Sequence, residues 1–105
     1  MTVSAADLDR VVEQIVALCN PNQILLFGSF AKGTDHSRSD VDLLIVAPSA
    51  LPRAQRGKEL SAALTAYSSR FDVLYYTPAE LADELADPTS FVAMIEPTLR
   101  LLYSR

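Results

Sequence analysis

The sequence has one cysteine, one histidine, three glycines and no tryptophan among its 105 residues. The single cysteine, Cys19, cannot form an internal disulfide, which fits a reducing compartment. No uninterrupted apolar run exceeds five residues, whereas a membrane-spanning helix needs about 20. Residues 1–10 carry two aspartates and no basic segment followed by an apolar one, so no signal peptide is expected. These absences predict a soluble, cytoplasmic protein.

Basic residues are also few, with nine Lys and Arg against 13 Asp and Glu, a net charge of -4 and a pI near 4.7. This charge has the wrong sign for general attraction to phosphate backbones, so free nucleic acid is not expected as a partner. A phosphate-bearing ligand would have to be held locally, by backbone N–H groups, a few cations or a bound metal. Half of the residues are hydrophobic and 21% are charged. This composition and length predict one globular domain over residues 1–105.

Hydrophobic periodicity predicts alternating helices and strands. Short apolar runs bounded by turn residues indicate buried strands, and apolar residues three and four apart indicate helices. Thr77-Pro78-Ala79-Glu80 combines a cap, a proline and a glutamate in the order that begins a helix, and Asp87-Pro88 is expected to restart it. We therefore predict an α/β fold around one small sheet. The predicted strands are 23–27, 41–46, 71–76 and 99–103, and the predicted helices are 5–19, 52–69 and those beginning near 78 and 88.

Gly28-Ser29 directly follows the first predicted strand and precedes Phe30-Ala31-Lys32, which could form a turn of helix. A glycine at such a strand-to-helix turn lets backbone amides approach a phosphate closely, and a helix N-terminus favours negative charge. Taken alone, the dipeptide is more typical of a tight turn with a serine helix cap.

Asp40 and Asp42 lie two residues apart at the start of the second predicted strand. Side chains two apart on a strand point to the same face, with α-carbons about 6.5 Å apart. Two carboxylates this close repel each other unless a cation or hydrogen-bond donors compensate them. Aspartate oxygens suit Mg²⁺, which takes its other ligands from water and substrate phosphates. A solvated strand end is the alternative interpretation of this pair.

Asp72 interrupts the third apolar strand, where an isolated carboxylate would be costly to bury. Beside a two-metal site, a third carboxylate can bind an ion and accept the proton of an attacking hydroxyl. Pairing with Arg70 or Arg38 would explain the same residue without any catalytic role.

Gly-Ser, ten intervening residues, Asp-x-Asp and a later strand aspartate together resemble the signature of the DNA polymerase beta-like nucleotidyltransferase superfamily. The pattern Gly-Ser-x10-Asp-x-Asp would arise by chance in roughly one chain in a thousand of this length. The short chain, with Gly28 to Gly33 reading GSFAKG and Ser39 to Leu43 reading SDVDL, is most similar to minimal nucleotidyltransferase (MNT) proteins. The resemblance implies a small mixed sheet flanked by helices in the polymerase beta-like fold.

The resemblance also implies a role for each matching residue. Gly28 and Ser29 would hold the triphosphate of ATP, and Lys32 could neutralise part of the leaving pyrophosphate or remain a solvated lysine. Three carboxylates would bind two Mg²⁺ ions and form the catalytic site: Asp40, Asp42 and Asp72.

MNT proteins of this size resemble the antitoxins of HEPN/MNT toxin-antitoxin pairs, which implies transfer of AMP from ATP to a tyrosine of a HEPN ribonuclease toxin. Two alternatives stay open: an antitoxin that neutralises its partner by contact alone, and nucleotidyl transfer to a small molecule such as an aminoglycoside. Exposed apolar residues near the C-terminus could support a homo-oligomer or hetero-oligomer: Leu99, Leu101 and Tyr103.

Two charged groups outside this signature are interpreted first as solvated helix faces. One is basic and could also contribute to a partner contact: Arg53, Arg56 and Lys58. The other is acidic: Glu80, Asp83, Glu84 and Asp87.

Overall fold

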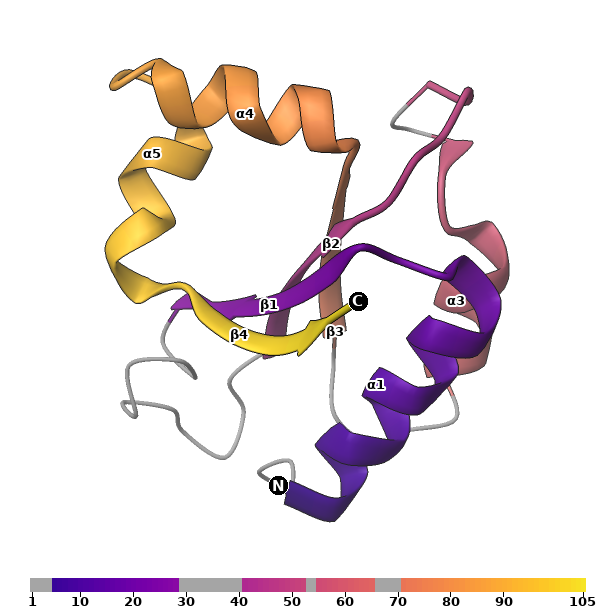
Figure 1. Ribbon diagram of the computed structural model, residues 1–105. Coiled ribbons are helices and arrows are strands. Elements are labelled where there is room, and N and C mark those ends of the chain that lie inside the picture. Colours follow the sequence, from indigo (N-terminus) through magenta and orange to yellow (C-terminus); the bar gives the residue numbers. More distant parts are fainter. Residues whose placement is uncertain (1–4, 29–40, 53–54, 66–70) are drawn as a thin grey trace.

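The computed structural model describes residues 5–28, 41–52, 55–65 and 71–105 and places a sheet between helices that cover both of its faces (Figure 1). None of the helices in these described ranges has the length and hydropathy needed to cross a bilayer. The elements follow in this order: α1 (Ala5–Cys19), β1 (Gln23–Phe27), β2 (Val41–Val46), α3 (Lys58–Leu64), β3 (Phe71–Tyr76), α4 (Pro78–Ala86), α5 (Phe91–Ile95), the 3-10 helix η2 (Glu96–Thr98) and β4 (Arg100–Ser104).

The sheet has four strands in the order β3-β2-β1-β4. β2 and β3 run parallel, whereas β1 is antiparallel to both β2 and β4. The predicted bounds of the first three strands and of α1 are confirmed, and the last strand begins at Arg100, one residue later than predicted. The mixed α/β architecture predicted from the sequence is therefore correct.

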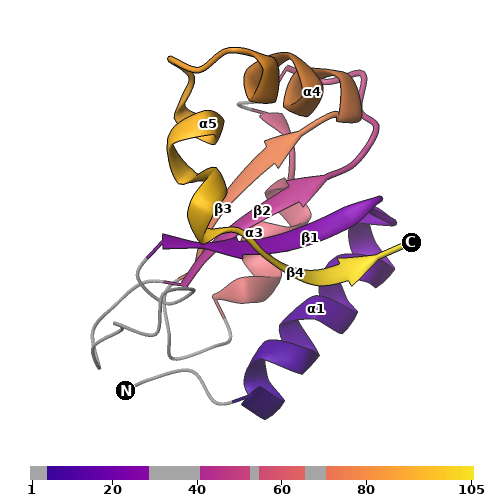
Figure 2. The ribbon, with the colours of Figure 1, turned by 60° about the vertical axis from the view of Figure 1, so that its left-hand side comes forward.

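Each face of the sheet packs against a different pair of helices (Figure 2). β2 is apolar along nearly its whole length because its side chains enter both cores in alternation. The core under α1 and α3 consists of Val11, Ile15, Ile24, Leu26, Val41, Leu43, Ile45, Leu60 and Leu64. The core under α4 and α5 consists of Phe27, Leu44, Val46, Tyr76, Val92 and Ile95.

Helix α3 is much shorter than predicted. The sequence predicts a helix over 52–69, but α3 begins at Lys58, after Gly57, which has a φ of 76°. Glycine populates this left-handed region readily, and the conformation does not continue into a right-handed helix. The Tyr75 ring also lies where a β-carbon on Gly57 would be. Residues 53–54 and 66–69 of the predicted helix lie outside the described ranges.

The capping box predicted at the start of α4 is confirmed. The Glu80 amide donates to Thr77 Oγ1 at 3.1 Å, and the Thr77 amide donates to Glu80 Oε1 at 2.9 Å. The restart predicted at Asp87-Pro88 is wrong by a few residues. Asp87 instead accepts hydrogen bonds from the amide and hydroxyl of Thr89, and the Ser90 side chain caps α5.

Arg56 is not the solvated residue predicted from its basic neighbourhood. Its guanidinium donates to both carboxylate oxygens of Glu80, at 2.7 and 3.2 Å, and to the Tyr75 carbonyl at 3.3 Å. The Arg56 side chain is 9% exposed and that of Glu80 is 36% exposed. A bidentate pair of this kind joins the segment before α3 to the first turn of α4, so Glu80 does more than line an outer helix face.

Replacing Thr77 with alanine is expected to lower the free energy of unfolding by about 1 kcal/mol, because one side-chain cap of α4 is lost. Urea denaturation followed by circular dichroism measures this change. Thr65→Ala is the matched control, since Thr65 is exposed and its hydroxyl donates to the Ala62 carbonyl at the end of α3. Equal midpoints for Thr77→Ala and the unmodified protein would show that the capping box does not stabilise the fold.

Candidate nucleotide site at one end of the sheet

Three of the predicted site residues meet at one end of the sheet. β2 and β3 are parallel and both begin there, and β1, which is antiparallel to β2, ends there with Phe27 opposite Asp42. Gly28 follows Phe27 directly. The topology therefore places Gly28, Asp42 and Asp72 on three adjacent strand ends, although they are far apart in the sequence.

Asp42 and Asp72 are direct neighbours in the parallel β2–β3 register. Adjacent strands lie about 4.8 Å apart, and both aspartates are even-numbered, so they share the face that Leu44, Val46 and Tyr76 direct toward α4 and α5. Asp42 is half-buried and Asp72 is exposed. The Asp42 carboxylate therefore lies at the margin of the apolar core, and the Asp72 carboxylate is open to solvent.

Gly28 lies directly against the Asp42 carboxylate. A β-carbon added to Gly28 would collide with Asp42 Oδ2 and would lie 3.4 Å from Asp42 Cγ. Gly28 also has a φ of 80°, in the left-handed region that side chains disfavour. The position therefore requires glycine for two independent reasons, its backbone conformation and the close approach of a carboxylate.

A fourth residue at this end, Thr98, carries no signal in the sequence. Its hydroxyl oxygen accepts a hydrogen bond from the Gly28 amide at 3.3 Å and donates its own hydrogen to the Ile95 carbonyl at 2.8 Å. Thr98 lies 70 residues from Gly28 along the chain. An isolated threonine after a proline matches no motif, so sequence reasoning had no means of finding this contact.

Ser29, Lys32 and Asp40, which the sequence also assigns to the site, lie outside the described residues. Within the described ranges, no three His, Cys, Asp or Glu side chains gather closely enough to hold a metal ion. Asp42 and Asp72 nevertheless fit a Mg²⁺ site in chemistry and placement, because they set two hard oxygen ligands side by side on one face. Asp40, two residues before Asp42, is the third ligand that the sequence predicts.

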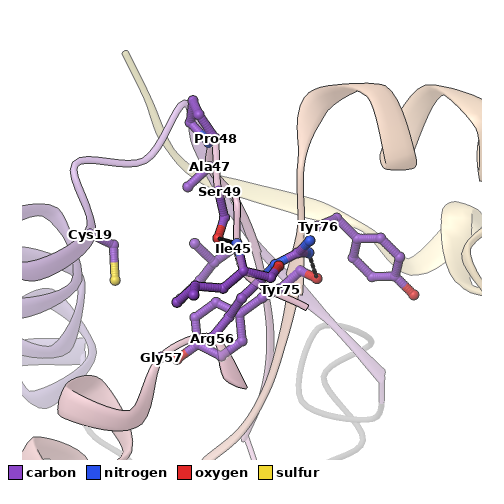
Figure 3. Close-up of a pocket in the computed structure, with 10 residues that line it drawn as sticks. Cys19, Ile45, Ala47, Pro48, Ser49, Arg56, Gly57, Tyr75 and Tyr76 are labelled. Carbon is purple, nitrogen blue, oxygen red and sulfur yellow. Dashed lines mark hydrogen bonds between the residues drawn. The ribbon is translucent and has the colours of Figure 1, made fainter. Parts of the chain in front are cut away.

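A cavity of about 140 Å³ lies at the opposite end of β2 and β3 (Figure 3). Its walls include Cys19, Ile45, Ala47 and Tyr75. Asp42, Asp72 and Gly28 do not line it, and it is therefore separate from the candidate site.

Burial governs the ionisable groups beside this cavity. It raises the pKa of the Tyr75 hydroxyl, which has no hydrogen-bond partner in the described part of the chain. Burial also raises the pKa of the half-buried Cys19 thiol, and the negative charge of Glu59 raises it further. Both groups stay protonated at neutral pH, so neither is a ready nucleophile.

The family model for the nucleotidyltransferase domain matches residues 8–92, which include Gly28, Asp42 and Asp72. The chain belongs to the nucleotidyltransferase domain family. The match runs from the fourth residue of α1 to the second residue of α5, so every strand except β4 lies within it. A search of curated proteins gives no match.

Solved structures share the fold. A proposed nucleotidyltransferase from Sulfolobus solfataricus superposes with a TM-score of 0.64 at 18% identity, over 93% of this chain and 78% of that one. A toxin-antitoxin with AMP-PNP gives 0.61 at 23% identity, over 92% and 73%. A mutant of the toxin-antitoxin MntA-HpeT gives 0.62 at 21% identity, over 99% and 75%. The nucleotidyltransferase fold implied by the sequence resemblance is thereby confirmed.

Proposed function

We propose that this protein is a Mg²⁺-dependent nucleotidyltransferase that transfers AMP from ATP to a tyrosine of a HEPN ribonuclease toxin, and so acts as an antitoxin. The observation that carries the proposal is the meeting of Gly28, Asp42 and Asp72 at one end of the sheet. The family assignment supports nucleotidyl transfer as the reaction class.

In this proposal, the turn that begins at Gly28 binds the triphosphate together with Ser29 and Lys32. Asp40, Asp42 and Asp72 hold the metal, and Mg²⁺ when bound stabilises the charge on the attacking and leaving oxygens. The acceptor oxygen forms a bond to the α-phosphorus, and the bond from that phosphorus to the β-phosphate oxygen breaks. Pyrophosphate leaves with the bonding electrons, and Asp72, which is exposed, would receive the acceptor proton.

The choice of acceptor rests on the solved structures that share the fold. Two of them are toxin-antitoxin complexes, one of them with AMP-PNP, a non-hydrolysable analogue of ATP. These relatives support a toxin partner and a nucleotide substrate. The tyrosine acceptor and the HEPN identity of the partner are carried over from the sequence resemblance.

Intact-mass spectrometry of the protein encoded beside this one tests the proposal directly. After incubation with this protein, Mg²⁺ and ATP, the partner is expected to gain the mass of one or more AMP units. Chelation of Mg²⁺ with EDTA is expected to abolish the gain, because the ion that Asp42 and Asp72 would hold supplies the positive charge that the reacting phosphate oxygens need. A partner of unchanged mass in a stable complex would contradict catalysis.

Neutralisation of the toxin by contact alone is the second candidate function. Exposed apolar side chains on α5 and on the edge strand β4 favour it. Met94 is 69% exposed, Leu101 is 56% exposed and Phe91 is 43% exposed. Large exposed apolar groups often mark protein interfaces. Protection of cells from the toxin by a catalytically inactive Asp42→Asn variant would favour this candidate over enzymatic modification.

A further inference from the structure

The hydrogen bond between Gly28 and Thr98 extends the pairing of β1 with β4 beyond the regular ladder. Leu25 pairs with Leu101 and Leu26 with Arg100, and two residues further in the same register Gly28 comes opposite Thr98. The Thr98 hydroxyl accepts from the Gly28 amide at the place where a backbone carbonyl would otherwise accept. Gly28, the residue that follows β1, is therefore attached to the C-terminal segment by a side chain.

Thr98 is itself held firmly. It ends η2 directly after α5, and its hydroxyl donates to the carbonyl of Ile95, which is 9% exposed in the core. A hydroxyl has one hydrogen and two acceptor positions, so the two bonds fix its orientation. The Gly28 amide therefore donates to Thr98, whose hydroxyl is held in turn by the buried residue Ile95 of α5.

Gly28 is constrained from two sides. Thr98 occupies its amide, and the Asp42 carboxylate lies against its α-carbon. Glycine has more backbone freedom than any other residue, so these two contacts restrict the backbone at Gly28. They hold Gly28 in place beside the Asp42 carboxylate.

We propose that Thr98 is a positioning residue for nucleotide binding: its hydroxyl fixes the backbone of Gly28 relative to the Asp42 carboxylate. The inference rests on the proposed nucleotidyl transfer and adds to it a residue that the family signature does not contain. Thr98 would touch neither substrate nor metal, and would act through the orientation of Gly28.

Thr98→Val tests the inference, because valine keeps the shape and β-branching of threonine and removes the hydroxyl. We expect the dissociation constant for Mg²⁺ and AMP-PNP, measured by calorimetry, and the KM for ATP to rise about tenfold to a hundredfold. The kcat should fall less. Thr98→Ser keeps the hydroxyl and should stay within about threefold of the unmodified protein.

Thr65→Val is the matched control. The Thr65 hydroxyl donates to the carbonyl three residues earlier, Ala62, at 2.7 Å, as Thr98 donates to Ile95, but Thr65 does not contact Gly28. This variant loses a comparable hydrogen bond and should bind nucleotide normally. Equal weakening in Thr65→Val and Thr98→Val would overturn the positioning role and leave a general effect on stability.

Amide hydrogen exchange in the unmodified protein gives a readout that does not depend on the folding of any variant. The bond to Thr98 predicts that the Gly28 amide exchanges at least about tenfold more slowly than in an unfolded chain. An unprotected Gly28 amide, or unchanged AMP-PNP binding in a folded Thr98→Val protein, would overturn the inference alone. An unmodified protein that binds no nucleotide would overturn the proposed function, and the inference with it.

Discussion

Replacing Asp42 with asparagine is expected to lower nucleotidyl transfer about a hundredfold to a thousandfold while leaving the fold intact. Asparagine keeps the shape of the side chain and removes the negative charge with which Asp42 would bind Mg²⁺. Asp42 is half-buried at the margin of the α4–α5 face, so its replacement by a neutral isostere should not disrupt packing. Transfer is measured as the initial rate of pyrophosphate release in the presence of the acceptor protein.

Asp83→Asn controls for the change in net charge. Asp83 is exposed on α4, away from the strand ends that carry the candidate site. Its replacement should keep the rate of transfer within about twofold of that of the unmodified protein, because exposed surface substitutions rarely have larger effects. Undiminished transfer by a folded Asp42→Asn protein would mean that the chemistry takes place elsewhere.

Replacing Gly28 with alanine is expected to affect activity more than stability. The left-handed backbone at φ 80° costs an alanine about 1–2 kcal/mol. The added β-carbon would also collide with Asp42 Oδ2, which is the end of a short rotatable side chain and can turn away. Displacement of this carboxylate by about 1 Å is expected to reduce transfer about a hundredfold. Thermal unfolding and the rate of pyrophosphate release measure the two effects separately.

Gly57→Ala is the matched control, since Gly57 also has a positive φ but lies beside the cavity at the other end of the sheet. There the added β-carbon meets the ring of Tyr75, which is rigid and packed against the α1–α3 core. We expect a larger loss of stability than in Gly28→Ala and a smaller loss of activity per folded molecule. The reverse order would show that the Gly28 turn is a structural feature without a catalytic role.

The sheet could be predicted largely from the sequence because its strands are short apolar runs bounded by turn and helix-capping residues. Pro21 and Gly28 enclose β1, and the capping box at Thr77 follows directly on β3. Helix α3 begins at Lys58 and not at Pro52 because the positive φ of Gly57 does not continue into a right-handed helix. The Tyr75 ring, which lies where a β-carbon on Gly57 would be, comes from a later strand, so this contact is not visible in the spacing of apolar residues.

The candidate site was predictable in its aspartates and not in its supports. The resemblance placed Asp42 and Asp72 together, and the parallel register of β2 and β3 makes them neighbours. Thr98 acts through a contact with Gly28, 70 positions away. Such a long-range hydrogen bond depends on tertiary structure, and a lone threonine has no spacing signal that would indicate its partner.

Nucleotide is expected to bind at the sheet end that carries Gly28, Asp42 and Asp72, and nuclear magnetic resonance tests this location most directly. Titration of the labelled protein with Mg²⁺ and AMP-PNP should shift the backbone amide signals of these three residues. The signals of Cys19 and Tyr75, beside the cavity at the opposite end, should stay in place. Shifts confined to Cys19, Tyr75 and their neighbours would contradict the account.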